Sequence, residues 1–386
     1  MKKFIVCLML LLSGVKLSAS DEIRVSLLTC EPGTEIYALF GHTAIRYEHP
    51  ALGRDWVFNY GMFSFDTPNF VMRFVKGETD YQLGVISYQR FEMEYALRGS
   101  SVYQQTLNLT SEEKVRLIHL LETNYLPDNR VYRYNYFYDN CTTRARDKIE
   151  ESLMGHVVYP KNEKKVTFRD IIHQFTAGNE WSEFGIDLCL GCEADKPIDE
   201  REQMFAPFYM LEAARGAMVH RGDTILPLIQ SEMKIVEAFR EDEEGFPLSP
   251  WHCAMGLLVV SVLMVVWGIK RKRVVWVWDI LLFGMQGVGG CIVAFLFFFS
   301  QHPTVGSNWM LALLNPIPLF YLPIMVYKDI KRQKDFYHWV NSVYLTIFIV
   351  LMPFLPQEFN GTVVPLGLSF LLTSVGHIYI YKKNHQ

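Results

Sequence analysis

The sequence predicts an α+β globular domain followed by an all-α membrane domain of five transmembrane helices. Three observations support this fold class. Half of the 386 residues are hydrophobic, and they are unevenly spread. Up to about residue 250 short apolar runs alternate with polar ones, and beyond it long apolar segments dominate. The chain also begins with the pattern of an export signal. Because no single globular domain fits this distribution, the two regions are treated separately.

The first 20 residues have the three parts of a secretory signal peptide. Residues 2–3 are lysines, residues 4–15 are apolar, and residues 18–20 read Ser-Ala-Ser, the small-residue pattern that signal peptidase accepts. We expect the mature chain to begin near Asp21, outside the cytoplasm. An uncleaved N-terminal anchor is the alternative, and it leaves the following domain on the same side of the membrane.

Residues 21–250 are predicted to form one exported domain that mixes strands and helices. The runs 23–30 and 43–47 are rich in β-forming residues, whereas 111–124 and 144–154 have helical patterns. A domain of this length can bury a substantial core without help from a metal or a disulfide.

The membrane domain is predicted to span residues 251–386. Each of its five apolar segments is near the roughly 17 to 25 residues that a membrane-crossing helix needs. The segments cover residues 253–269, 275–298, 309–327, 339–355 and 362–381. Pro316, Pro318 and Pro323 in the third segment predict a broken helix.

Charges in the connections predict the orientation of these segments. Ten lysines and arginines fall on one side of the membrane, at 270–273, 328, 331, 332, 334, 382 and 383, whereas the loops 301–308 and 356–360 contain none. The positive-inside rule therefore predicts a multi-pass protein of the inner (cytoplasmic) membrane, with its globular domain in the periplasm and its C-terminus in the cytoplasm. For the intramembrane Asp279 and His377 we expect structural roles, because Asp279 can reach or pair with the cations at 270–273.

Composition and spacing exclude several classes of function. The net charge of -4 and the lack of a long basic block argue against nucleic-acid binding. The sequence lacks the G-x-S-x-G motif that would indicate a serine hydrolase. We expect neither a metal nor a cofactor, because the exported histidines have no metal-ligand spacing; these are His49, His119, His156, His173 and His220.

Two short stretches are typical of thiol chemistry. Cys141 lies just ahead of a predicted helix, whose positive end and free N–H groups lower a thiol pKa. The same N–H groups, with the amide of Cys141, are placed to hold an oxyanion. His42 follows a glycine and opens a β-branched strand, so it is the candidate base.

A third group has to orient the imidazole. The chain turns after His42 and returns through Asn59, so a hairpin would bring Asn59 beside His42. Asp139 is the second candidate for this orienting role, and Asn140 is a candidate amide donor to the oxyanion.

Cysteine pairing is the main alternative, because the exported region has four cysteines in an oxidising compartment. A Cys30–Cys141 disulfide would remove the nucleophile. For Cys189 and Cys192, separated by two residues, a structural disulfide is favoured over a redox motif or half a zinc site.

The stretches 28–33, 40–44, 59–63 and 140–144 together resemble the periplasmic domain of the Bacteroidota lipoprotein N-acyltransferase family, and the five-span tail is similar too. More distantly, the pattern resembles the circularly permuted NlpC/P60 and lecithin:retinol acyltransferase group of papain-like thiol enzymes. The resemblance implies a papain-like periplasmic domain with no cofactor.

The resemblance also implies roles and partners. Cys141 would be the nucleophile, His42 the base and Asn59 the orienter, although the wider group commonly has a second His at the last position. The acyl donor would be a phospholipid of the inner membrane, and the acceptor the α-amine of a lipoprotein's N-terminal diacylglyceryl cysteine. An NlpC/P60-like cell-wall peptidase or amidase is the first alternative, although five spans argue against it. A non-catalytic membrane scaffold is the second, and a Cys30–Cys141 disulfide would favour it.

Overall fold

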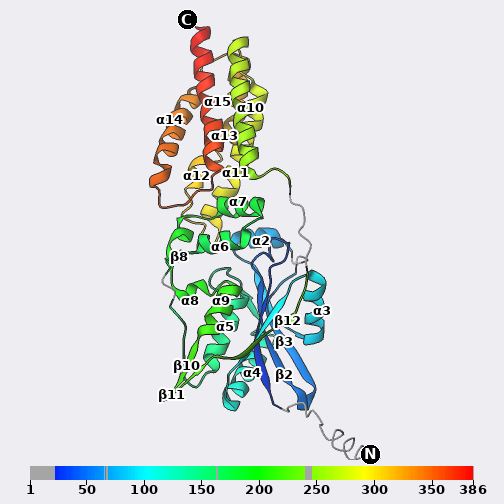
Figure 1. The fold of residues 1–386 in the computed structure, drawn as a ribbon. Coiled ribbons are helices and arrows are strands. Elements are labelled where there is room, and N and C mark those ends of the chain that lie inside the picture. Colours follow the sequence, from blue (N-terminus) through cyan, green and yellow to red (C-terminus); the bar gives the residue numbers. More distant parts are fainter. Residues whose placement is uncertain (1–21, 65, 67, 162–163, 240–245, 386) are drawn as a thin grey trace, which may run out of the picture.

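A sheet domain and a bundle of apolar helices lie at opposite ends of an elongated molecule (Figure 1). The computed structural model describes residues 22–64, 66, 68–161, 164–239 and 246–385. The predicted signal peptide, residues 1–20, lies outside the described residues. The predicted fold class, an α+β domain followed by five apolar helices, is confirmed.

The globular domain is built on a seven-stranded antiparallel sheet with the strand order β12-β5-β1-β2-β3-β4-β6. Side chains alternate along β1, so Val25 and Leu27 join one core while Leu28 and Cys30 join another. Both faces of the sheet are therefore covered. The strands are β1 (Arg24–Cys30), β2 (His42–His49), β3 (Arg54–Met62), β4 (Asp80–Ser87), β5 (Val102–Leu107), β6 (Val131–Arg133) and β12 (Ile229–Val236).

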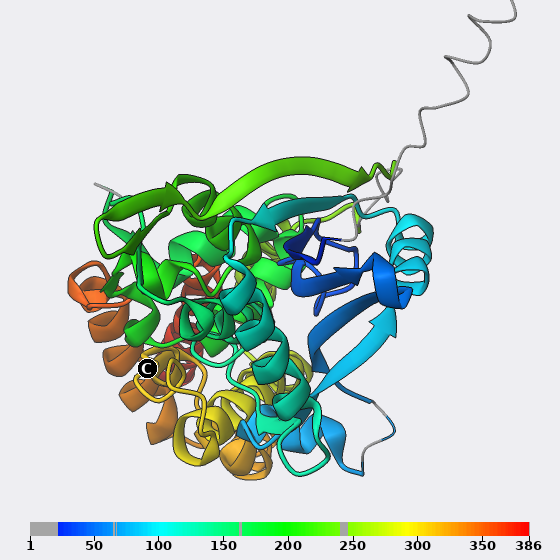
Figure 2. The same cartoon turned by 90° about the horizontal axis from the view of Figure 1, so that it is seen from below.

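Helices cover both faces. Helix α3 (Tyr88–Arg98) packs on one face, and α4 (Ser111–Tyr125) and α5 (Cys141–Ser152) lie on the other (Figure 2). Helix α4 begins as its sequence predicts, because the Thr110 side chain accepts the amide of Glu113 and the Glu113 carboxylate accepts the amide of Thr110. This packing of α5 against β2 and β3 gives the papain-like layout of a helix on an antiparallel sheet.

The remaining elements of the globular domain are short. They are η1 (Pro50–Leu52), α2 (Phe70–Lys76), β7 (His156–Val158), β8 (Val166–Thr167), α6 (Phe168–Thr176), α7 (Glu180–Cys189), η2 (Cys192–Asp195), β9 (Pro197–Ile198), α8 (Glu200–Gln203), α9 (Pro207–Gly216), β10 (Met218–Arg221) and β11 (Thr224–Pro227). Among them, α6 and α7 lie between the main sheet and the membrane helices, whereas a three-stranded sheet, β11-β10-β7, lies beside the main sheet (Figure 1).

Among the described residues, five helical segments are long and apolar enough to cross a membrane, as predicted. The chain is a multi-pass membrane protein. The segments are formed by α10 (Pro250–Arg271), α11 (Trp276–Phe299), α12 (Met310–Leu313) with α13 (Ile317–Ile330), α14 (Phe336–Leu351) with η3 (Met352–Phe354), and α15 (Val363–Asn384).

The third segment is broken between α12 and α13, as its prolines predict. The break frees backbone groups that lipid cannot satisfy, and the Gln286 side chain donates to the carbonyl of Leu313 at 2.8 Å. Gly290 allows the break to approach α11 closely, because an added Cβ there would lie 2.2 Å from the Asn315 carbonyl carbon.

The loops without cations face the globular domain. The amide of Gly191 donates to the carbonyl of Thr304 at 2.7 Å, and the Gln357 side chain donates to the carbonyl of Leu190 at 3.2 Å. The globular domain and both loops therefore lie on one side of the bundle. The lysine- and arginine-rich connections lie at the other end, as the charge pattern requires.

A buried ion pair holds this junction. Arg169 is only 1% exposed and bridges Asp187, at 2.7 Å, and Asp195, at 2.6 Å. Asp187 also accepts the side-chain amide of Asn360, which precedes α15, at 3.0 Å. The same network thus links α6, α7 and η2 to the membrane domain.

Replacement of Arg169 by Met should destabilise the chain strongly, because it leaves the Asp187 and Asp195 carboxylates buried without their cation. We expect a loss of unfolding free energy on the order of 3 kcal/mol, measured as a lower Tm of the full-length protein in detergent. Arg133→Met is the control, since Arg133 is half-exposed and pairs with Asp80 on the surface. Equal Tm shifts in the two variants would contradict this role for the junction.

Candidate active site

The β2–β3 hairpin brings His42 and Asn59 together. His42 is the first residue of β2, and its Nε2 atom is hydrogen-bonded to Oδ1 of Asn59. Gly41 has a φ of 77°, and an added Cβ there would lie 2.4 Å from the carbonyl oxygen of Cys30. Only glycine allows the chain to enter β2 so close to β1. The hairpin expected from the sequence is present, and it places Asn59 beside His42.

Cys141 is the first residue of α5, and the cap of that helix fixes its position. The Asn140 side chain accepts the amides of Thr142 and Thr143 at 2.8 and 2.9 Å. The Thr142 hydroxyl in turn lies 3.0 Å from that of Thr43 on β2, both buried. These contacts hold the N-terminus of α5 against the strand that begins with His42.

A bulge in β3 makes room for the thiol. The pairing of β3 with β4 shifts register between Asn59 and Met62, and Gly61 within this bulge has a φ of 82°. A Cβ on Gly61 would lie 3.6 Å from Cβ of Cys141. The bulge thus lets the end of β3 pass directly beside the nucleophile.

The electrostatic environment favours a thiolate at Cys141. Burial raises the pKa of the Cys141 thiol, but the charge and hydrogen bond of His42 and the amide of Thr43 outweigh it and lower the pKa to about 7. For His42, burial lowers the pKa of the imidazole, and the interactions with Cys141 and Asn59 raise it above its usual value. Because Nε2 of His42 faces Asn59, Nδ1 is the nitrogen left for the sulfur.

Asp139 and Asn140 have structural roles here. The Asp139 carboxylate accepts two hydrogen bonds from Arg144, at 2.6 and 2.7 Å, and the oxygen beside Nε2 of His42 belongs to Asn59. The side-chain amide of Asn140 donates to the carbonyls of Tyr136 and Phe205. Neither side chain takes the alternative role considered for it.

The backbone donors at the start of α5 also need a correction. Asn140 occupies the amides of Thr142 and Thr143, which were expected to help hold the oxyanion. The amide of Cys141 itself is the expected donor that this cap does not use.

Neither the expected Cys189–Cys192 disulfide nor the alternative Cys30–Cys141 disulfide is formed, and all six cysteines in the described part of the chain are free. Cys30 lies opposite His42 in the register of β1 and β2. Burial raises the pKa of the Cys30 thiol well above the usual range. Cys189 ends α7 and Cys192 begins η2, and Gly191 between them packs against the backbone of the membrane-domain loop at Ser307. The Cys189–Cys192 disulfide is therefore corrected to two free thiols.

A largely apolar cavity of about 590 Å³ opens beside the three residues. One wall is the aromatic run that precedes α5, another is Phe74 of α2, and a third is the membrane-domain loop at 302–305. Neither α2 nor this loop was predicted to be part of the site. The signal that could have found the loop is its lack of cations, which places it on the side of the globular domain.

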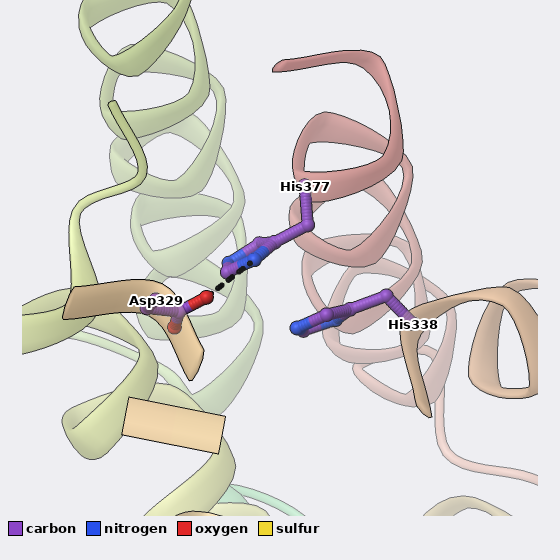
Figure 3. Close-up of side chains that lie close together, drawn as sticks. All are labelled: Asp329, His338 and His377. Atoms are coloured by element: carbon purple, nitrogen blue, oxygen red, sulfur yellow. Dashed lines mark ion pairs between the residues drawn. The ribbon is translucent and has the colours of Figure 1, made fainter. Parts of the chain in front are cut away.

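Two groups of histidines and carboxylates could hold a metal ion among the described residues, and neither includes a residue of the thiol site. They are His173, Glu183 and Asp187, and Asp329, His338 and His377 (Figure 3). In the first group Asp187 is already paired with Arg169. The second lies within the membrane helices at the end of the bundle away from the globular domain.

The comparisons with known proteins match both halves of the chain. The family model described as the Lnb N-terminal periplasmic domain matches residues 16–174, and the one described as the Lnb transmembrane domain matches residues 241–384. No curated protein and no solved structure matches. The chain therefore belongs to the Lnb lipoprotein N-acyltransferase family, the family that its own motifs resemble.

Proposed function

We propose that this chain is a lipoprotein N-acyltransferase. It moves an acyl chain from a phospholipid, through a thioester on Cys141, to the α-amine of a lipoprotein's N-terminal diacylglyceryl cysteine. The observation that supports this most is the placement of a thiol, an imidazole and an amide beside an apolar cavity that shares a wall with the membrane domain. A site in that place can take both lipid substrates without extracting them into water.

The first half-reaction acylates the enzyme. The Cys141 thiolate attacks the carbonyl carbon of the phospholipid ester, and the negative charge moves to the carbonyl oxygen, near the amide of Cys141. As the carbonyl re-forms, the ester C–O bond breaks. The protonated His42 gives its proton to the departing lysophospholipid oxygen. Cys141 is then an acyl thioester and His42 is neutral.

The second half-reaction transfers the acyl chain. The free α-amine of the lipoprotein's terminal cysteine attacks the thioester carbonyl carbon, and neutral His42 takes a proton from the nitrogen. The C–S bond breaks, and the sulfur leaves as a thiolate. The products are an N-acylated lipoprotein and the original thiolate–imidazolium pair. Asn59 would keep the imidazole aligned in both halves by accepting from its Nε2–H.

We also propose that the protein lies in the inner membrane, with the globular domain in the periplasm and the C-terminus in the cytoplasm. The support is the separation of charge along the bundle: the cationic connections lie at the end away from the globular domain. The predicted export signal gives the same orientation independently.

Two alternatives lose support from this geometry. A cell-wall peptidase needs a cleft for a polar peptide or sugar, whereas this cavity is largely apolar and borders the membrane domain. A non-catalytic scaffold drew its support from a Cys30–Cys141 disulfide, and both cysteines are free.

Removal of the Cys141 thiol should abolish acyl transfer. We would reconstitute the full-length protein in phospholipid vesicles with a diacylglyceryl-cysteine peptide that has a free amine, and measure the N-acylated product by mass spectrometry. Cys141→Ala and Cys141→Ser should lower the rate by at least about 10³-fold. Cys189→Ala, the control at another exported thiol, should react like the wild type.

If the Cys141 variants form the N-acylated peptide as fast as the wild type, Cys141 is not the nucleophile. If neither the wild type nor any variant acylates the peptide, and the wild type alone cleaves a cell-wall peptide, the peptidase function would be favoured instead.

Alkylation of Cys141 should report its lowered pKa. The thiolate is the form that reacts with iodoacetamide, so the wild-type rate should be half-maximal near pH 7, the pKa of Cys141. His42→Ala removes the strongest interaction that lowers this pKa, so the profile should move to higher pH. Peptide mass spectrometry would measure labelling of Cys141 separately from the other thiols.

His49→Ala is the matched control, because His49 contacts Tyr47 instead of the thiol. A wild-type profile in His42→Ala would show that the imidazole does not activate Cys141.

A further inference from the structure

We infer that Asp329, His338 and His377 form a binding site for a divalent transition-metal ion at the end of the bundle away from Cys141. The three side chains come from α13, α14 and α15 and converge on one point (Figure 3). One ligand atom from each lies within 4.8 Å of the others. Two imidazoles and a carboxylate are the donor set that Zn²⁺ and similar first-row ions prefer.

Buried atoms without partners support the site. His338 is 1% exposed, and its Nδ1 lies 3.3 Å from the Ser374 hydroxyl. Within the described part of the chain, Nε2 of His338 has no hydrogen-bond partner. Neither does Oδ2 of Asp329. A buried polar atom left unpaired is costly and uncommon, and two of them on converging side chains are most simply satisfied by a shared ligand.

The neighbouring Asp279 is suited to orient a metal-binding imidazole. It was expected to reach the cations at 270–273, but it is 1% exposed and instead lies 3.0 Å from Nε2 of His377. Nδ1 of His377 lies 3.3 Å from Asp329. A carboxylate bound to the far nitrogen of a metal-ligating histidine fixes the ring and its tautomer. Asp279 is therefore a positioning residue for this site, and Nδ1 of His377 is the ligand atom.

Charge balance favours a divalent cation. Asp279 and Asp329 place two carboxylates in a buried region, and within the described chain their ion-pair partner is His377, which can carry one positive charge at most. A dication would neutralise both carboxylates while the imidazoles of His338 and His377 stay neutral. Their rings stack with centroids 3.8 Å apart.

The geometry needs only a small closure. Tetrahedral Zn²⁺ with Zn–N bonds of about 2.0–2.1 Å holds its donor atoms about 3.4 Å apart. Nδ1 of His377 already lies 3.3 Å from Asp329, and the other ligand atoms, which lie within 4.8 Å of one another, have to close by at most about 1.4 Å. A cavity of about 680 Å³, lined by all three residues, gives a path to the distal end of the bundle. Arg271 and Lys331 are among the cations that line it, which would slow the entry of a dication without contributing to the cluster.

The test measures metal bound to the full-length protein in detergent. After treatment with a chelator, the protein would be incubated with Zn²⁺ and desalted, and zinc per chain would be measured by mass spectrometry of the elements. We expect about one zinc per wild-type chain and a higher Tm with Zn²⁺ than with chelator. His338→Ala and Asp329→Asn should lose both effects. Asp279→Asn should weaken Zn²⁺ binding by about 10- to 100-fold.

His173→Ala is the matched control, because it removes a histidine from the other histidine–carboxylate group. The pH profile of Cys141 alkylation in each variant would verify that the chain is folded, since the thiol lies in the globular domain, away from the three ligands. If the wild-type protein does not retain zinc, the proposed site is wrong. It is also wrong if folded His338→Ala retains zinc while His173→Ala loses it. Neither result bears on the acyl-transfer proposal.

Discussion

The N-terminus of α5 has to meet the end of the β2–β3 hairpin, and the active site depends on this contact. The cap formed by Asn140 sets where α5 begins, and the hydroxyl contact between Thr142 and Thr43 sets where it docks. Together they bring the thiol to His42. Burial alone would raise the pKa of Cys141, and it is the imidazole beside the thiol, with the amide of Thr43, that lowers this pKa to about 7.

The membrane domain contributes to the site as well as anchoring it. Its loop at 302–305 forms one wall of the cavity, and His302 also hydrogen-bonds the carbonyl of Phe74 in α2. Val71 and Met72 of the same short helix are exposed, on the side of the globular domain that meets the bundle. A thiol domain attached in this way presents its cavity where lipids are available, and the buried Arg169 network keeps the two parts in register.

Local patterns predicted much of this arrangement. The capping pair of Thr110 and Glu113, the hairpin that carries Asn59 and the five apolar segments all depend on neighbours in sequence or on length, which a single sequence shows. The role of Asn140 was not predictable, because its side chain could serve either the helix cap or the reaction. Its side-chain amide donates to the carbonyls of Tyr136 and Phe205, which decides for the cap. The disulfide expected of Cys189 and Cys192 was inferred from their close spacing in an oxidising compartment, which does not show where each thiol lies.

Contacts between segments that are distant in the sequence could not be predicted from it. His338 lies just before a predicted span, and nothing in the sequence indicates a ligand role for it. Asp329 and His377 come close to it only when three helices pack together. The cavity wall at 302–305 likewise exists only because the membrane domain docks on the globular domain. Spacing along one helix or strand predicts neighbours on that element, but it does not predict which elements meet.

The central claim is that Cys141 carries the acyl chain between the two lipids, and trapping that species tests it most directly. Full-length protein would be incubated with phospholipid of one defined acyl length and no amine acceptor, and then analysed by intact-mass and peptide mass spectrometry. The account predicts one added acyl chain on Cys141, released by neutral hydroxylamine as a thioester should be. An acyl chain on another residue, or none on wild-type protein that still forms product with acceptor present, would contradict it.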